Sequence, residues 1–388
     1  MSINPLVELT SLGQSVWYDN IERKLITSGE LRRLIEEDSL RGVTSNPAIF
    51  EKAISGSDLY QDQLRELAEQ GKSANDIYEE IAVRDVRMAA DELASVYEQT
   101  GGEDGYVSLE CSPLLANDTQ GTIEEARRLW RWLDRKNVMI KIPGTPEGIP
   151  AIEQCIYEGI NINITLLFSL TSHEQTMEAY IRGLERRAKE GKPVNNISSV
   201  ASFFVSRVDT AADKLIEDRI KQAASEEEKS GLRSLLGRIA IANAKMAYQR
   251  YKEVFHGERF AALKARGARV QRPLWASTST KNPAYKDVYY VEALIGPETV
   301  DTMPPATLEA FRDHGAARVT IEDNLDEARS LIARLEEVGI SLEEITGQVL
   351  DEGVQKFVEP FEKLLSATES RRNEIIKGSG KPQESAAD

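Results

Sequence analysis

The sequence predicts an α/β fold in which eight parallel strands alternate with helices and close into a barrel. Eight short apolar segments follow one another along the 388 residues, and helical patterns separate them. Polar residues stand at the C-terminal ends of several of these segments, the end at which such barrels carry their sites. The sequence contains neither a fixed-period repeat nor a GxGxxG or GxxxxGK[ST] motif, so a solenoid and a nucleotide-binding open sheet are both disfavoured.

The eight predicted strands are rich in β-branched or aromatic residues and are bounded by turn-forming residues. They cover residues 15–20, 42–46, 106–110, 138–142, 159–168, 196–205, 273–278 and 299–303. Helices cover both faces of the strands in a parallel barrel, so these strands should be almost entirely apolar. The polar residues inside them are therefore informative.

The predicted helices fill the intervals between the strands and continue beyond the last strand. They cover residues 30–38, at least two helices within 47–104, 146–157, 206–251 and most of 305–372. The patterns TIEE at 122–125 and TSHE at 171–174 predict two helix starts, and Asn324 and Ser341 predict two more. We predict one barrel domain over residues 1–376, with inserted helices and a helical C-terminal extension, followed by a polar, disordered tail at 377–388.

One lysine, Lys141, lies in the middle of the apolar strand 138–142. Lys141 and Met139 share one face of this strand, and its valine and isoleucines share the other. Because a buried ammonium without a partner is costly, such a lysine pairs with a carboxylate, reaches solvent or loses its proton. A deprotonated lysine is an amine nucleophile for carbonyl carbon. This segment alone leaves a structural and a catalytic lysine both open.

Six polar residues stand at or near the ends of predicted strands, on the face opposite the bulky aliphatic side chains. They are Asp19, Asn46, Glu110, Lys141, Asn163 and Thr165. Each has an ordinary alternative: Asp19 can cap a helix, Asn46 can begin the turn before Pro47, and Glu110 can be a structural partner of Lys141. An accidental convergence of all six would require separate hydrogen-bond partners for each. We therefore predict one polar site at the mouth of a (β/α)8 TIM barrel.

Charge and composition exclude several classes of function. The chain has 48 Lys and Arg against 64 Asp and Glu, a net charge of −16, which argues against nucleic acid or an anionic membrane as a partner. The two cysteines, Cys111 and Cys155, fit a reducing compartment, and the N-terminus has no signal or transit character. No apolar run approaches the ~18 residues of a membrane span. We expect a cytoplasmic protein.

The three histidines, His173, His256 and His314, fall in or beside predicted helices and away from the strand ends. We expect surface or structural roles for them, which argues against a serine or cysteine triad. No two of them stand at ligand spacing, so we expect no metal site.

Four motifs follow one another along the chain: GVTSNPA at 42–48, VMIKIPGTPEGI at 138–149, GININITLLFS at 159–169 and SVASFFVSRVD at 199–209. Together, and in this order, they resemble the motifs of the transaldolase family. The resemblance runs from about Asp19 to the eighth strand. It implies a class I, Schiff-base mechanism that moves a dihydroxyacetone unit from sedoheptulose 7-phosphate or fructose 6-phosphate to an aldose phosphate. This is a step of the non-oxidative pentose phosphate pathway, and it implies neither a metal nor an organic cofactor.

The resemblance also implies the roles of the reacting residues. Lys141 would form the imine, and Glu110 and Thr165 would hold the water that moves protons while the imine forms and breaks down. Asp19 would take the hydroxyl proton as the C3–C4 bond breaks, a task that suits a carboxylate within hydrogen-bond reach.

The remaining residues implied by the resemblance bind the substrate. Asn46 and Asn163 would contact substrate hydroxyls and the enamine, and Ser202 and Arg207 would bind the sugar phosphate. Better-known members of the family have a second phosphate-binding arginine after the seventh strand. This chain has STSTKNPAY there, and Lys281 is the candidate, which keeps the charge but loses the planar fork. We leave monomer and homodimer both open.

Two other functions stay open at this point. A fructose 6-phosphate aldolase resembles this family but releases dihydroxyacetone, and in that branch glutamine tends to replace the glutamate and tyrosine a phenylalanine near the phosphate site. Glu110 and Phe204 therefore favour transfer, and such aldolases are also shorter. A barrel that only binds sugar phosphates would not need Lys141, Glu110 and Asp19 together.

Overall fold

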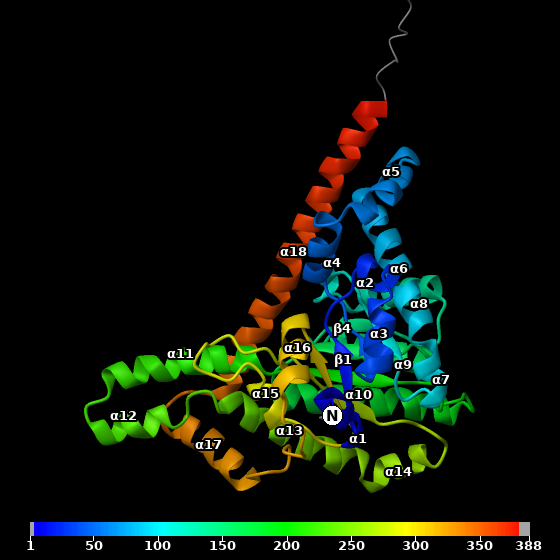
Figure 1. Ribbon diagram of the computed structural model, residues 1–388. Helices are drawn as coiled ribbons and strands as arrows, with labels where there is room; N and C mark the ends of the chain where they lie inside the picture. The colour runs from blue at the N-terminus through cyan, green and yellow to red at the C-terminus, as the bar shows by residue number, and fades with distance from the viewer. Residues whose placement is uncertain (1–3, 380–388) are drawn as a thin grey trace, which may run out of the picture.

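The computed structural model describes residues 4–379, in which eight parallel strands close into a barrel in chain order (Figure 1). The strands are β1 Gln14–Tyr18, β2 Leu40–Val43, β3 Tyr106–Glu110, β4 Val138–Pro143, β5 Ile162–Leu167, β6 Ser199–Phe204, β7 Gln271–Ala276 and β8 Thr299–Met303. Each strand pairs in parallel with the next one, and β8 pairs with β1. The predicted barrel is confirmed, although most strand boundaries differ from the predicted ones.

Strand β4 shows how the wall of the barrel positions polar side chains. All its residues are buried. Helices cover the outer face of a parallel barrel, and side chains from all the strands fill its interior. In the register of the sheet, Lys141 of β4 pairs with Glu110 of β3 on one side and with Asn163 of β5 on the other. Three neighbouring strands therefore bring a polar residue to the same level of the barrel.

The helices surround the barrel and extend it at both ends. They are α1 Pro5–Ser11, α2 Arg23–Thr27, α3 Glu30–Glu37, α4 Pro47–Ser55, α5 Gln61–Glu69, α6 Ala74–Glu92, α7 Ala94–Gln99, α8 Thr119–Leu133, α9 Gly148–Glu158, α10 Leu170–Lys189, α11 Ser206–Gln222, α12 Glu226–Arg233, α13 Ile239–Phe255, α14 Glu258–Lys264, α15 Tyr289–Ala293, α16 Pro305–His314, α17 Leu325–Glu337 and α18 Leu342–Ser379. Two short 3-10 helices are η1 Asp58–Tyr60 and η2 Pro113–Leu115.

Two of the four predicted helix starts are wrong. Helix α8 begins at Thr119, because the side chain of Asp118 accepts a hydrogen bond from the backbone of Gly121. Helix α10 begins at Leu170, because Ser169 caps it in the same way. In both cases an earlier capping residue satisfies the free N–H groups before the predicted capping box is reached. Helices α17 and α18 follow the predicted residues 324 and 341 directly.

The C-terminal helix α18 is 38 residues long and rises from the barrel beside α4, α5 and α6 (Figure 1). Its lower part also packs on α11. Near its end, Arg372 Nε donates to the backbone oxygen of Lys72. The helix continues to Ser379, and residues 380–388, most of the tail predicted to be disordered, lie outside the described residues. That the barrel and these helices form one domain stays a prediction.

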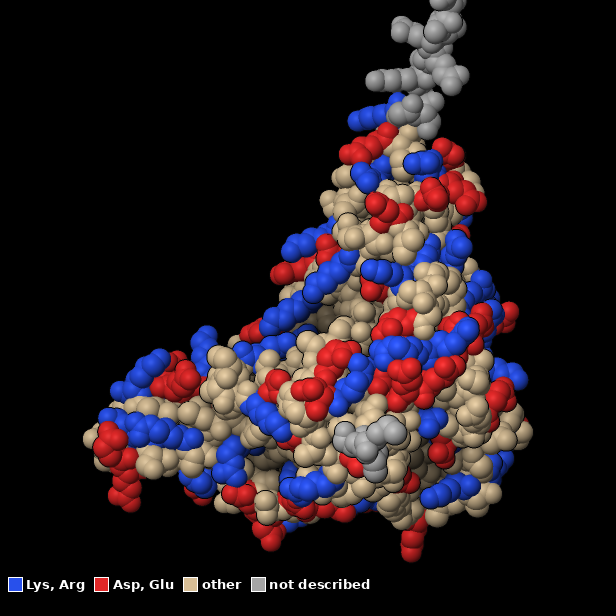
Figure 2. Space-filling view, in the orientation of Figure 1, with Lys and Arg blue, Asp and Glu red and all other residues tan. Residues whose placement is uncertain are grey.

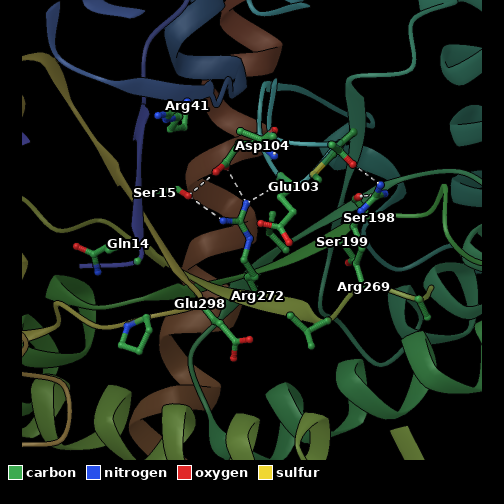
Figure 3. Close-up of a pocket in the computed structure, with 18 of the residues that line it drawn as sticks. Gln14, Ser15, Arg41, Glu103, Asp104, Ser198, Ser199, Arg269, Arg272 and Glu298 are labelled. Carbon is green, nitrogen blue, oxygen red and sulfur yellow. Dashed lines mark hydrogen bonds and ion pairs between the residues drawn. The ribbon is translucent and has the colours of Figure 1, made fainter. Parts of the chain in front are cut away.

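A charged network closes the N-terminal end of the barrel (Figure 3). Asp104 accepts hydrogen bonds from Ser15 Oγ at 2.7 Å and Trp17 Nε1 at 3.1 Å, and it forms an ion pair with Arg272 at 2.8 Å. Arg272 also donates to Ser15 Oγ at 2.8 Å. The pocket at this end measures about 690 Å³. Asp104 and Arg272 bond to each other and to residues of β1. The network therefore connects β1 and β7 to the segment that precedes β3.

Acidic and basic side chains are interspersed over the face that Figure 2 shows. Among the described residues many charged side chains pair, as Arg259 does with Glu178 and Glu185. Among residues 4–379, no helix combines the length and the apolar character that crossing a membrane requires.

Candidate active site

A pocket of about 610 Å³ lies at the C-terminal end of the barrel, between the strand ends, α4 and α18. Figure 2 shows a hollow at this place, with basic side chains along its margin. Eight of the ten residues predicted for the site line the pocket: Asp19, Asn46, Lys141, Thr165, Ser202, Phe204, Arg207 and Lys281. The other two, Glu110 and Asn163, lie behind this lining and contact Lys141 and Ser202.

Lys141 is buried and paired. Its Nζ lies 3.1 Å from Glu110 Oε2 and donates to the backbone oxygen of Ser45 at 2.9 Å. The side chain of Lys141 is 6% and that of Glu110 5% exposed, so bulk water screens the pair little. Of the alternatives that the sequence leaves open for this lysine, the structure therefore has the carboxylate pair. Transfer of one proton to Glu110 would leave a neutral amine facing the pocket.

Burial raises the pKa of both carboxyl groups near Lys141. For Glu110, burial raises the pKa and the charge of Lys141 opposes this shift. Asp19 follows β1, and its Oδ1 accepts a hydrogen bond from Thr44 Oγ1 at 2.7 Å. Burial raises the pKa of Asp19 as well, again against the charge of Lys141. A carboxyl group with a raised pKa can exchange protons closer to neutral pH, as acid–base chemistry requires.

Thr165 presents a hydroxyl that the fold does not use. Its Oγ1 is buried in the pocket wall and has no hydrogen-bond partner among the described residues. The next residue, Leu166, has a φ of +58°, and the pairing of β5 with β6 shifts register just after Ile164. A leucine in the left-handed region is strained by ~1 kcal/mol or more. Buried hydroxyls normally find a partner, so this one is suited to hold a water or a substrate oxygen.

Two asparagines support the site in different ways. Asn46 Oδ1 caps α4 by accepting from the backbone N–H of Ile49 at 3.1 Å, so the cap does not use its amide NH2 group. Asn163 is fully buried, donates to Ser108 Oγ at 3.0 Å and accepts from Ser202 Oγ at 2.7 Å. Asn163 therefore fixes the orientation of Ser202, and its own contact with substrate stays a prediction.

Arg207 is the strongest candidate for binding an anion. It lies in the first turn of α11, where the helix dipole also favours negative charge. Its guanidinium carbon is 5.2 Å from the ring centroid of Phe204 and 5.8 Å from that of Phe357. Burial lowers the pKa of this guanidinium, and the nearby carboxylates oppose the shift. Its buried Nη1 has no hydrogen-bond partner among residues 4–379, so a phosphate oxygen would complete its bonding.

Three lysines stand around the rim of the pocket. Lys281 is exposed after β7 and donates to Ser279 Oγ at 2.9 Å. Lys52 of α4 and Lys356 of α18 also line the pocket, and Lys356 pairs with Glu352 at 3.1 Å. Sequence reasoning missed Lys52 and Lys356. Helix α4 follows Asn46 directly, so a signal for Lys52 was present, whereas α18 reaches the mouth of the barrel only through long-range packing.

Two threonines were also missed. Thr44 and Thr302 line the pocket, and their Oγ1 atoms are 2.7 Å apart. Thr44 lies inside the motif GVTSNPA, beside a residue that was chosen, so a signal for it was present. Thr302 lies in the predicted eighth strand, and only its position within a short TVDTM segment could have marked it.

The histidines lie away from the pocket, and none of the three lines it. His173 is fully buried in α10, and burial lowers its pKa to about 4. His256 contacts Glu298, and His314 contacts Asp287. Within residues 4–379, no group of three or more His, Cys, Asp or Glu side chains is arranged to hold a metal ion.

Fold and site together define a class, the β/α-barrel enzymes that act on anionic substrates, here with an amine, two carboxyl groups and an arginine around one cavity. The sequence model of the family described as Transaldolase/Fructose-6-phosphate aldolase matches residues 16–368. The chain belongs to this family.

Curated relatives cover nearly the whole chain. It is 48% identical over 373 residues to "Transaldolase" of Trichodesmium erythraeum, an alignment that covers 96% of this chain and 98% of the relative. It is 48% identical over 374 residues to "Transaldolase 2" of a Nostoc species, with the same shares covered. It is also 48% identical over 363 residues to "Transaldolase" of Thermobifida fusca, covering 93% of this chain and 96% of the relative.

Proposed function

We propose that this protein, a transaldolase by its family and relatives, transfers a dihydroxyacetone unit through a Schiff base on Lys141. Written in full, sedoheptulose 7-phosphate and glyceraldehyde 3-phosphate give erythrose 4-phosphate and fructose 6-phosphate. The observation that carries the mechanism is the buried pair of Lys141 with Glu110 at the floor of the pocket. This pair can supply a neutral amine and a nearby acid from one proton transfer.

The first half of the reaction forms the imine. Lys141 passes a proton to Glu110, and its amine attacks the carbonyl carbon of the ketose. The carbinolamine then takes a proton back and loses water, which Glu110 and the free hydroxyl of Thr165 can hold. The resulting positive C=N bond draws electrons from the neighbouring carbon.

The second half breaks and remakes a C–C bond. Asp19 takes the proton of the C4 hydroxyl, the C3–C4 electron pair moves to the imine as an enamine, and the aldose phosphate leaves. The enamine carbon then attacks the aldehyde carbon of the acceptor, and Asp19 returns the proton to the new hydroxyl. Water hydrolyses the imine and restores Lys141. The raised pKa of Asp19 suits both proton steps.

Other groups around the pocket bind the substrate. Arg207 holds the sugar phosphate with its unpaired Nη1, and Ser202 of β6 lines the same pocket. Lys281 is proposed as a second, more exposed phosphate contact. Asn46 offers its amide NH2 group to substrate hydroxyls. The proposed chemistry requires neither a metal nor an organic cofactor.

The test is the consumption of fructose 6-phosphate with and without erythrose 4-phosphate. The family description also names fructose-6-phosphate aldolase, so release of free dihydroxyacetone is the second candidate. Glu110 and Phe204 favour transfer. We expect fast turnover only when the acceptor is present, and equal turnover without it would establish the aldolase instead. Borohydride added with fructose 6-phosphate should fix the three-carbon adduct to Lys141, which mass spectrometry of the peptides detects.

We place the reaction in the cytoplasm, in agreement with two cysteines that are free and buried. Sugar phosphates are the proposed partners. The choice between monomer and homodimer stays a prediction, which the molar mass in solution decides.

A further inference from the structure

The helix α18 presents two residues of one face to the active site. Gly353 and Phe357 are four residues apart, so they share a face of the helix. Both are buried although α18 lies far from the strands in the sequence. Phe357 lines the active-site pocket, and Gly353 lies against Arg207 and the end of β5.

Phe357 stands over both charged groups on which the proposed reaction depends. The ring centroid lies 5.6 Å from Lys141 Nζ and 5.8 Å from the guanidinium carbon of Arg207. Only 5% of the residue is exposed. At these distances the ring attracts each cation through its π face. Lys141 and Phe357 both line the pocket and both are buried, so the ring occupies space next to the amine that water would otherwise fill.

Gly353 determines how closely α18 can approach Arg207 and Leu166. A Cβ atom at this position would lie 3.1 Å from Leu166 Cδ2 and 3.5 Å from Arg207 Nη1. Glycine inside a helix costs about 0.5–1 kcal/mol relative to alanine, so its presence here calls for a local reason. The close approach of α18 to Arg207 and Leu166 provides that reason.

We infer that Phe357 is a specificity-determining residue of the transaldolase, and that Gly353 positions it: together they hold Arg207 and exclude water from the enamine on Lys141. This inference rests on the proposed function. The enamine has two fates. Attack on an aldehyde acceptor transfers the three-carbon unit. Alternatively the enamine carbon takes a proton, and one water then hydrolyses the C=N bond to free dihydroxyacetone and the lysine. A dry cover over Lys141 disfavours the second fate.

The first test replaces the ring by a smaller apolar side chain, Phe357→Leu. Two rates are measured with fructose 6-phosphate: transfer to erythrose 4-phosphate, and release of dihydroxyacetone without an acceptor. We expect the ratio of release to transfer to rise at least about tenfold, because water reaches the enamine. The Michaelis constant for fructose 6-phosphate should also rise about threefold to thirtyfold, because Arg207 loses one of its two rings.

The matched control is Phe361→Leu, one turn further along the same face of α18. Phe361 is buried against Tyr78, with ring centroids 5.6 Å apart. This variant removes a similar volume from the helix and should lower the melting temperature, but the ratio of release to transfer should stay unchanged. An equal change of the ratio in both variants would show a general loosening of α18 and would overturn the inference.

The second test compares two glycines of the same helix. Gly347→Ala places its Cβ in open space, so it should leave both rates unchanged. Gly353→Ala crowds Leu166 at 3.1 Å and fills the space beside Arg207, so α18 must move away from Arg207. The variant should raise the Michaelis constant for fructose 6-phosphate but not for unphosphorylated fructose. Equal effects on both sugars would contradict the role of Gly353.

The failure of the inference and that of the proposed function are distinguishable. If borohydride still fixes the adduct to Lys141 in Phe357→Leu, and the ratio of release to transfer stays at the wild-type value, the role of Phe357 is wrong while the Schiff base stands. If the wild-type protein forms no adduct at Lys141, the proposed function itself fails, and the inference falls with it.

Discussion

Lys141 and Glu110 are register partners on adjacent strands, and their Nζ and Oε2 atoms lie 3.1 Å apart at the floor of the pocket. Because β3 and β4 fix the backbone of both residues, the pair needs no loop movement to form. The proton that the pair shares is the first one that the proposed reaction must move. Most of the predictions below concern this pair and the groups around the pocket above it.

The change Lys141→Met removes the amine and keeps a similar side-chain length. We expect a folded protein whose turnover falls by at least ~10⁴-fold, because a covalent route is lost. The circular dichroism spectrum should match that of the wild type. Turnover that stays within tenfold of the wild type would remove Lys141 from its proposed role.

The change Glu110→Gln leaves a hydrogen-bonding group beside Lys141 but removes the proton acceptor. We expect the turnover number to fall by about 10²- to 10⁴-fold, the usual contribution of a general acid–base group. The raised pKa of Glu110 predicts that the acidic limb of the wild-type pH–rate profile lies above the ordinary glutamate range and is lost in the variant. The same limb in both proteins would assign the profile to another group, and Asp19 would be the next one to change.

The change Arg207→Ala should act mainly on binding. We expect the Michaelis constant for phosphorylated sugars to rise about tenfold to a hundredfold, the worth of hydrogen bonds to a charged group. Arg207→Lys should fall between the two, because it keeps the charge and loses the fork. Steady-state kinetics with fructose 6-phosphate and with fructose measure the effect, and an equal rise for fructose would contradict a phosphate contact.

The change Lys281→Ala tests the more exposed phosphate contact. Lys281 donates to Ser279 and lies in solvent, so its interaction with a phosphate is screened and worth less than that of Arg207. We expect a rise of the Michaelis constant of about two- to fivefold, which fades at high salt. Without any salt-dependent effect, Lys52 or Lys356 would be the better candidate for this contact.

The burial of Asp301 in β8 leads to a prediction of how the free energy of unfolding depends on pH. It is fully buried, accepts a hydrogen bond from Thr278 Oγ1 at 2.9 Å, and burial raises its pKa to about 8. The folded protein thus keeps this carboxyl protonated, whereas the unfolded chain releases the proton above about pH 4. The contribution of Asp301 to stability is therefore greatest below pH 4 and falls as the pH rises to about 8.

The change Asp301→Asn removes this titration. Relative to the wild type, the variant should gain stability on going from pH 5 to pH 8, by on the order of a few kcal/mol. Urea unfolding at the two pH values measures the gain. If the variant and the wild type differ in their free energy of unfolding by the same amount at both pH values, Asp301 does not titrate in this range.

The fold could be predicted because its main signal is local. Strand β4 is an apolar run with one charged residue, and β3 and β8 match their predicted boundaries. The starts of α8 and α10 were wrong because Asp118 and Ser169 compete with the later capping boxes. Such competition depends on the direction of the entering chain, which the sequence pattern does not contain.

The site was predictable where strand geometry decides it. Glu110, Lys141 and Thr165 stand on strands, so their period and their place near the C-terminal ends of the strands put them in the mouth of the barrel. Asn163 bonds to Ser108 and Ser202, and its Nδ2 keeps a second hydrogen, so its role in substrate binding stays a prediction. No local pattern marks Phe357, because its place over the pocket results from the packing of a whole helix.

Helix α18 follows all eight strands in the sequence, and this affects the order in which the protein is synthesised and folds. The eight strands leave the ribosome before α18, since this helix follows all of them in the sequence. A nascent chain whose barrel has already closed would thus hold Lys141 under an open mouth, with Phe357 still to be translated. With the role inferred for Phe357, transfer without release would therefore begin only after α18 has joined the barrel.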